Sequence, residues 1–315
     1  MRFSLRALRY VVETADAGSV TEAAKRLNVS QPSISAALSQ METELGVQIF
    51  VRHLAKGVTL SPAGQRLVND ARLLLNHARD FAQSAQSLGS TLHGEIVVGS
   101  FLTLATRFMP GLLSGFRARQ PGISVKLEEG DQQEIIDGLL SGRTELALSY
   151  SFAVPDEIVG EKFCDLPPYI LLAADHPLAS RSSISLPEMR EEQFILLDLP
   201  HSRDYFASLF MACGIEPRIS FRTRSFELIR GLIGHKQGYS IHNAVPRTTI
   251  GYDGSRVAVV PITEKLPPTH VMALRLKRHA LRPAVQTFAD YAREAFSSDG
   301  QFAPGSIAPP GIDAA

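Results

Sequence analysis

The sequence predicts two structural classes in one chain: an N-terminal all-α unit with a helix-turn-helix and a long helix, then a C-terminal α/β domain. Three observations predict this. Capped amphipathic helices joined by a tight turn fill residues 1–60, an apolar repeat with gaps of four and three occupies residues 61–90, and short apolar strands alternate with helical stretches over residues 91–296. A chain of 315 residues suits two or three such domains.

Residues 18–50 have the layout of a helix-turn-helix. Ser19 followed three residues later by Glu22 predicts a capping box, in which the hydroxyl and the carboxylate each satisfy an amide at the helix start. Asn28 is expected to make the turn, and Ser30 to cap the second helix.

That second helix has two distinct faces. The predicted buried stripe consists of Ile34, Leu38, Met41 and Leu45. The opposite face is short, polar and uncharged, which suits an approach to base edges in the major groove of double-stranded DNA. The candidate DNA-binding residues are Gln31, Pro32, Ser33, Ser35, Ser39, Arg52 and Lys56. The alternative is an ordinary three-helix packing unit whose polar face meets solvent.

A first helix and a wing complete this unit. The helix is expected over residues 3–17, closed by Gly18, with a buried face of Leu5, Leu8, Val12 and Ala15. Residues 51–53 and 56–58 are two extended pieces joined by a turn that contains glycine. They are expected to form a wing that places two basic side chains, Arg52 and Lys56, on phosphates.

Residues 5–64 carry short motifs in the order and spacing of a known family. They are Ala23-Ala24, Ser30-Gln31-Pro32, Leu45-Gly46-Val47, Phe50 and Leu60-Ser61-Pro62-Ala63-Gly64. On these motifs the segment resembles the winged helix-turn-helix of LysR-type transcriptional regulators. Ala36 and Ala37 depart from the family, which often has a long polar or basic side chain there. Specificity is therefore expected to depend more on DNA shape.

The long linker helix carries a heptad seam over residues 61–90. Its members are Leu67, Ala71, Leu74, Ala78, Phe81, Ala85 and Leu88. So narrow an apolar seam needs a partner, which is either the chain's own domain or, as favoured here, the same helix of a second chain. The family resemblance implies the second, with two such dimers forming a homotetramer. Two reading helices at a fixed spacing then contact two half-sites.

The alternation of strands and helices predicts a parallel sheet with helices on both faces. Strands are expected at residues 95–99, 123–128, 145–149, 169–174, 194–197, 219–222, 239–242, 257–261 and 270–276. Helices are expected at residues 103–120, 131–140, 202–213, 226–234 and 283–296.

Four phrases of this part occur in the order found in the effector domain of LysR-type regulators: Phe116 to Gly122, Leu139 to Arg143, Asp175 to Ala179 and Gly214 to Pro217. The resemblance implies a two-lobed effector-binding domain like type 2 periplasmic-binding proteins. Lobe I is expected at about residues 94–161 and 267–296, and lobe II at about 162–266. Residues 297–315 are rich in small residues, Pro and Gly, and are expected to form a disordered tail.

Ligands of open α/β sheets bind beyond the carboxyl ends of strands, where helix N-termini present free amides. Ser100, Ser149 and Ser202 hold such positions, and the resemblance implies that their hydroxyls contact the effector. The expected neighbours are Thr103, Tyr150, His201, Arg203, Phe226 and His242. The alternative is that the serines are helix caps and Phe226 is a core residue.

Two residues bear on the charge of the effector in opposite ways. The Arg203 guanidinium could bind a carboxylate or phosphate bidentately. Asp131 stands where the family usually has a neutral hydroxyl, and as a helix cap it would occupy a dipole end that an anion could use. The balance favours a carboxylate effector only slightly.

Composition excludes several classes. Net charge is zero and the pI is near 7.1, so contact with DNA must be local rather than that of a general cationic coat. Cys164 and Cys213 have no metal-ligand or CxxC spacing and are expected to be structural thiols in a reducing compartment. With no cofactor motif, no metal site, no export signal and no apolar run of about 18 residues, we expect a cytoplasmic protein without a membrane partner.

The leading hypothesis is a LysR-type regulator whose operator binding or promoter activation is controlled by a small molecule between the lobes, with RNA polymerase as a further partner. An enzyme is not expected, because GxGxxG, P-loop, GxSxG and HExxH motifs are absent. The alternatives are a constitutive regulator without an effector and, less favoured, a two-lobed solute-binding protein.

Overall fold

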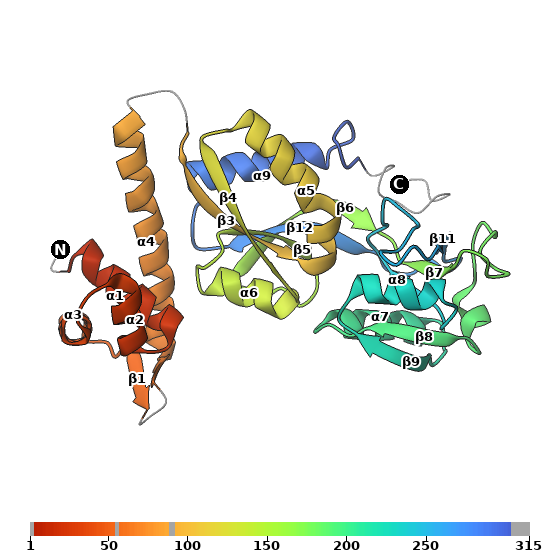
Figure 1. Ribbon diagram of the computed structural model, residues 1–315, viewed down its shortest axis with the longest axis horizontal. Helices are drawn as coiled ribbons and strands as arrows, with labels where there is room; N and C mark the ends of the chain where they lie inside the picture. The colour runs from red at the N-terminus through yellow and green to blue at the C-terminus, as the bar shows by residue number, and fades with distance from the viewer. Residues whose placement is uncertain (1–2, 54–56, 88–91, 304–315) are drawn as a thin grey trace.

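The computed structural model describes residues 3–53, 57–87 and 92–303. Figure 1 shows three parts in succession along the longest axis: an N-terminal head, the long helix α4, and a C-terminal domain of two lobes. Lobe I lies next to α4, and lobe II lies at the far end.

The head consists of three helices around one small core. They are α1 (Leu5–Ala17), α2 (Val20–Leu27) and α3 (Gln31–Leu45). The predicted stripe of α3 is confirmed in Ile34, Leu38 and Met41, which are buried in one cluster with Val11 of α1, while Leu45 is half-buried. The head therefore places the opposite, polar face of α3 on its outer surface.

The first helix forms, but its predicted buried face is partly wrong. The Ser4 hydroxyl accepts a hydrogen bond from the Ala7 amide at 3.2 Å, so the helix begins at Leu5, and the side chain of Leu5 is half-exposed. The buried residues are Leu8, Val11 and Thr14, whereas Val12 and Ala15 are half-buried.

Only half of the capping box predicted for α2 forms. The Ser19 hydroxyl accepts from the Glu22 amide at 3.4 Å. The Glu22 carboxylate instead lies 3.5 Å from the ammonium of Lys25 in the next turn. Asn28 ends the helix in the left-handed region, at φ 54°, as its turn-forming side chain predicts.

The wing consists of β1 (Phe50–His53) and β2 (Gly57–Leu60), which pair antiparallel. Strand β2 leads into α4 (Pro62–Ser87). The start of α4 lies close to Ile49 at the base of the wing. A side chain at Gly64 would place its Cβ 2.0 Å from the Ile49 carbonyl oxygen, so only glycine allows this approach.

The heptad seam of α4 is buried in one part and exposed to solvent in another. Ala71 is buried against the head, whereas the side chains of Leu74 and Phe81 are 42% and 76% exposed. Helix α4 also lies against lobe I, where the Asn69 amide donates to the Leu140 carbonyl at 2.6 Å. One part of the seam thus docks on the chain's own domain, and Leu74 and Phe81 remain free for a partner. Leu88 lies outside the described residues.

Lobe I is built on a five-stranded sheet in the order β4 (Ile123–Gly130), β3 (Gly94–Phe101), β5 (Leu146–Tyr150), β12 (Thr269–Leu276) and β6 (Ile158–Leu166). The first three strands are parallel, but β12 runs antiparallel to both neighbours. The prediction of a parallel sheet is therefore wrong at this edge, where the chain leaves lobe I along β6 and returns along β12.

Helices cover both faces of the lobe I sheet (Figure 1). They are α5 (Leu102–Arg119) and α9 (Pro283–Ala295) on one face, and α6 (Gln132–Leu140) on the other.

Lobe II contains two small sheets. One has β7 (Tyr169–Ala173) between β10 (Ser240–His242) and β11 (Val257–Pro261), all antiparallel, again contrary to the predicted parallel pairing. The other pairs β8 (Gln193–Leu197) with β9 (Arg218–Thr223) in parallel. The helical elements are α7 (Ser202–Ala212), α8 (Phe226–Gly234) and a 3₁₀ turn (Leu186–Met189).

The predicted disordered tail is wrong for residues 297–303. Phe302 is buried, packs edge-on against Phe108 at 5.0 Å between ring centroids, and its amide donates to the Ala295 carbonyl at 2.7 Å. A single aromatic ring thus anchors a segment of otherwise small residues. Residues 304–315 lie outside the described part of the chain.

Among the described residues, no helix combines the length and the hydropathy that crossing a bilayer requires.

Candidate functional site

The outer face of α3 is polar and neutral. Gln31, Pro32, Ser33 and Ser39 are exposed, and Ser35 is half-buried. In the first turn, the Gln31 amide donates to the Ser35 hydroxyl at 3.1 Å, and the Ser33 and Ser30 hydroxyls are 2.6 Å apart. These hydrogen bonds hold the side chains in place on the helix surface. On binding to DNA, base edges could take the place of the neighbouring side chains as hydrogen-bond partners.

The wing carries Arg52, one of the two basic residues predicted to contact phosphates. Arg52 lies on β1 with an exposed side chain, while Lys56 lies outside the described residues.

Glu42 fixes the wing to α3, a role that the sequence analysis missed. Its Oε1 accepts hydrogen bonds from the amides of Ile49 at 2.7 Å and Phe50 at 3.0 Å. The position of β1, and with it Arg52, therefore depends on a side chain of α3. Ile49 and Phe50 lie seven and eight residues after Glu42. No known sequence motif has this spacing, so the contact could not be predicted.

In the C-terminal domain, Ser100 and Ser149 are fully buried at the ends of β3 and β5. The Ser149 hydroxyl donates to the Gln132 side-chain oxygen at 2.8 Å, and the Gln132 amide donates to the Phe152 carbonyl at 2.7 Å. Gln132, fully buried at the start of α6, was not among the predicted residues. It makes Ser149 part of an internal network.

Five of the predicted residues line a small cavity between the lobes: Thr103, Tyr150, Ser202, Phe226 and His242. The remaining wall residues are Phe101, Phe152, Leu197, Phe206, Asn243 and Ala244. The cavity measures about 20 Å³, enough for one water molecule. The lobes are thus nearly closed on each other here.

Two polar groups face each other at the lobe I side of this cavity. The Thr103 and Tyr150 hydroxyls are 2.8 Å apart, and the Tyr150 ring packs edge-on against Phe101 at 4.8 Å. Burial raises the pKa of the Tyr150 hydroxyl far above its ordinary value, so this group stays neutral.

His242 forms the lobe II side. Its ring packs edge-on against Phe226 at 4.6 Å, and its Nε2 is buried with no hydrogen-bond partner among the described residues. Burial lowers the pKa of His242 to about 3, so the ring is neutral near pH 7. A buried ring nitrogen without a partner is a natural contact for a water molecule or a ligand.

His201 and Arg203 lie outside the cavity. His201 Nε2 is 3.3 Å from the Gln133 side-chain oxygen, and the exposed Arg203 guanidinium donates to Asp198 at 3.1 Å. Since Arg203 already has a carboxylate partner, the preference for an anionic effector that depended on it loses its basis.

Two family models match the chain. The first, a bacterial regulatory helix-turn-helix protein of the lysR family, matches residues 5–65, and the second, the LysR substrate binding domain, matches residues 89–297. The chain belongs to the LysR family. It is a DNA-binding transcriptional regulator whose C-terminal domain is the effector-binding domain of that family.

Known proteins resemble this LysR-type regulator over nearly its whole length. The crystal structure of HinK from Pseudomonas aeruginosa is 37% identical, with a TM-score of 0.64, and the match covers 96% of this chain and 100% of HinK. Full-length OxyR from Pseudomonas aeruginosa is 26% identical, with a TM-score of 0.73 over 93% of this chain and 95% of OxyR. The hydrogen peroxide-inducible genes activator of Dickeya chrysanthemi is 25% identical over 294 residues, 92% of this chain and 95% of that protein.

Proposed function

We propose that this LysR-type regulator reads its operator with the outer face of α3 in the major groove. The observation that carries the proposal is the exposed, neutral and polar surface of Gln31, Ser33 and Ser39 on a capped helix. Arg52 on the wing would contact phosphates, and the Glu42 bonds support it by fixing the wing to α3.

The operator complex would be a dimer formed through α4. The exposed side chains of Leu74 and Phe81 on one seam support this pairing. Two reading heads then bind two half-sites, and two dimers form a tetramer that contacts RNA polymerase. The proposed units remain the head at 1–60, the linker helix at 61–90 and the effector domain at 91–296.

The effector would bind at the inter-lobe cavity and bias the closure of the lobes. The residues around this cavity are uncharged, and the unpaired His242 Nε2 and the Thr103–Tyr150 hydroxyl pair supply neutral polar contacts. This favours a neutral polar group of the effector at this point. Its influence on DNA binding equals its differential affinity for the open and closed states.

The effector would bind non-covalently, unlike a thiol sensor of peroxide. Burial raises the pKa of the Cys164 thiol to about 12, and it also raises the pKa of Cys213. A reactive thiol needs a lowered pKa, because the thiolate is the nucleophile. We therefore propose that the similarity to a hydrogen peroxide-inducible activator does not extend to its stimulus.

The test is a mobility shift of the full-length protein on its own upstream intergenic DNA and on random DNA. Gln31→Ala and Ser33→Ala are expected to weaken specific binding about tenfold or more, since one bidentate base contact contributes about 1–3 kcal/mol. Gln286→Ala, an exposed change on α9, serves as the matched control. Equal specific binding by the parent and both α3 variants would refute the proposal for α3.

A further inference from the structure

A second and larger pocket lies beside the inter-lobe cavity. It measures about 340 Å³ and opens between α5 of lobe I and the α8 and 244–248 segments of lobe II. Thr103, Phe226 and Ala244 line both spaces and separate them. Its size is within the range of sites that hold small organic ligands.

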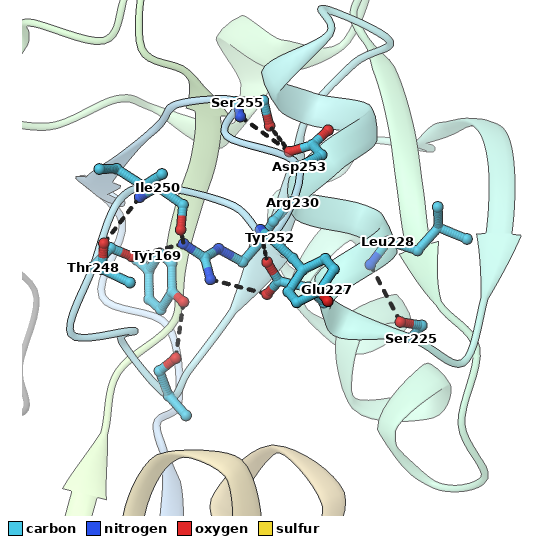
Figure 2. Close-up of polar contacts among 11 residues, drawn as sticks. Tyr169, Ser225, Glu227, Leu228, Arg230, Thr248, Ile250, Tyr252, Asp253 and Ser255 are labelled. Carbon is cyan, nitrogen blue, oxygen red and sulfur yellow. Dashed lines mark hydrogen bonds and ion pairs between the residues drawn. The ribbon is translucent and has the colours of Figure 1, made fainter.

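Four charged side chains line this pocket: Arg107, Arg230, Arg247 and Glu227. Figure 2 shows the polar contacts of Arg230. It is buried, one end of its guanidinium donates to Glu227 at 2.9 Å, and the other donates to the carbonyls of Thr248 and Ile250 at 2.7 Å each. Arg230 and Glu227 therefore neutralise each other and hold the wall of the pocket.

The other two arginines have no such partner. Within the described residues, no carboxylate lies at ion-pair distance from Arg107 or Arg247. The Arg107 Nε donates to the Val245 carbonyl at 2.9 Å, but its Nη1 is buried without an acceptor. Burial, and then the charge of Arg247, lower the pKa of Arg107. Two like charges thus share one pocket, with a buried donor unsatisfied.

Such an arrangement is unfavourable without a ligand. The Arg107 guanidinium lies 4.9 Å from the centroid of the Phe108 ring, which offsets part of the cost of its burial, but its Nη1 lacks an acceptor and the second cation adds repulsion. An anion between the two guanidinium groups removes both effects. The remaining walls include Pro110, Phe226 and Phe302, which offer apolar surface to the body of a ligand.

We propose that this pocket is a second ligand site, which binds an organic carboxylate with a compact apolar body. The carboxylate lies on Arg107 and Arg247, and the apolar body lies against Phe226 and Phe302. Because the walls come from both lobes, occupancy changes the equilibrium between open and closed lobes. The anion specificity that Arg203 does not supply thus comes from a different pair of arginines.

The test is calorimetric titration of the full-length protein at low ionic strength. The probes are phenylacetate, hexanoate and inorganic phosphate, with the uncharged phenylacetamide as the matched control ligand. We expect phenylacetate or hexanoate to bind, and phenylacetamide to bind at least about tenfold more weakly than phenylacetate, as the loss of a charge-assisted contact implies. Tighter binding of phosphate than of both carboxylates would contradict the apolar half of the site.

Substitutions of the pocket arginines test whether the carboxylate binds in this pocket. Arg247→Gln, an exposed residue outside the ion pairs of the fold, is expected to lower carboxylate affinity about tenfold, and Arg107→Gln to do the same. Arg107→Lys keeps the charge but also lacks the Nε that bonds Val245, so it separates the two effects and should retain more carboxylate affinity than Arg107→Gln. Arg203→Gln is the control for an exposed arginine of lobe II that already has a partner, and it should change nothing.

Further results would also overturn the proposal. They are no binding of either carboxylate, equal binding of phenylacetate and phenylacetamide, and unchanged affinity in Arg247→Gln. Ser202→Ala, in the neighbouring cavity, is expected to leave phenylacetate binding intact, and a loss there would place the ligand in the inter-lobe cavity instead. Operator binding is measured separately by mobility shift, so failure of this pocket and failure of the DNA-reading proposal are distinguishable.

Discussion

The Arg224 guanidinium of lobe II lies 2.9 Å from the Asp131 carboxylate of lobe I. Asp131 is buried, and its other oxygen accepts the Glu134 amide at 3.0 Å as the N-cap of α6. One carboxylate therefore both begins a helix and joins the lobes beside the cavity. The charge at Asp131, which on sequence grounds disfavoured an anionic effector, is balanced by a cation that lies 93 residues further along the chain.

Two substitutions separate these roles of Asp131. Arg224→Gln removes a partner whose side chain is 62% exposed, and we expect it to lower the unfolding free energy by at most about 1 kcal/mol. Asp131→Ala also removes the helix cap, and we expect an additional loss of about 1 kcal/mol. Denaturant unfolding of the full-length protein measures both, and equal losses would mean that the cap contributes nothing.

The link between Glu42 and the wing predicts a coupled loss of stability and DNA binding. Glu42→Ala leaves the Ile49 and Phe50 amides without their acceptor, which should destabilise the head by about 1–3 kcal/mol. Glu42→Gln keeps a side-chain oxygen and should lose less. Thermal unfolding and mobility shift check the pair. A Glu42→Ala protein with parental stability would show that water replaces the carboxylate freely.

Within lobe I, a buried ion pair joins the start of α9 to the start of β5. Arg282 and Glu145 are nearly inaccessible, and Arg282 Nε lies 2.5 Å from the Glu145 carboxylate. Arg282→Met should destabilise the domain by about 3–5 kcal/mol, because it leaves a buried carboxylate without its cation. Arg282→Met combined with Glu145→Leu removes both charges and should recover most of this loss. Additive losses in a double-mutant cycle would show that the two side chains act independently.

Peroxide treatment should leave operator binding unchanged. The raised pKa values of Cys164 and Cys213 keep both thiols protonated near pH 7, and protonated thiols react slowly. Mobility shifts before and after exposure to hydrogen peroxide, with Cys164→Ser and Cys213→Ser alongside, check this. A peroxide-dependent shift that one of these variants abolishes would make this chain a redox sensor.

Local patterns were sufficient to predict most helices and strands. The predicted helix over 226–234 and the predicted strand over 257–261 match α8 and β11 residue for residue, since each has a clear apolar period between strong boundaries. The strand over Ile158–Leu166 was missed because three consecutive residues of its centre, Gly160 to Lys162, are exposed and break the alternation. Its position depends on pairing with β12, more than a hundred residues later.

The contacts that define the sites were beyond local patterns. Strand ends and family resemblance were sufficient to predict that Thr103 and His242, which line the inter-lobe cavity, lie together, whereas Ser100 does not line it. The partner of Arg203 and the burial of Gln132 depend on tertiary packing. The second pocket is the clearest case, because Arg107 and Arg247 are 140 positions apart in the sequence and come from different lobes. Nothing in either local segment predicts that the two cations meet.

The buried ring of His242 predicts a pH dependence of stability. The unfolded ring binds a proton near pH 6.5, whereas the folded ring, with its pKa lowered to about 3, stays neutral. Between these values the unfolded state holds more protons, so stability is complete above pH 6.5 and falls by up to about 1.4 kcal/mol per pH unit as the pH drops.

His242→Gln removes this titration and should flatten the decline in denaturant midpoint from pH 6.5 to pH 5. Gln286→Ala, an exposed and non-titrating change on α9, is the control and should keep the parental slope. The slope is the decisive quantity, because the glutamine at 242 changes packing against Phe226 and shifts the midpoint at every pH. Identical slopes in the parent and His242→Gln would mean that the folded ring takes up its proton as readily as the unfolded one, and that the cavity admits a charged group.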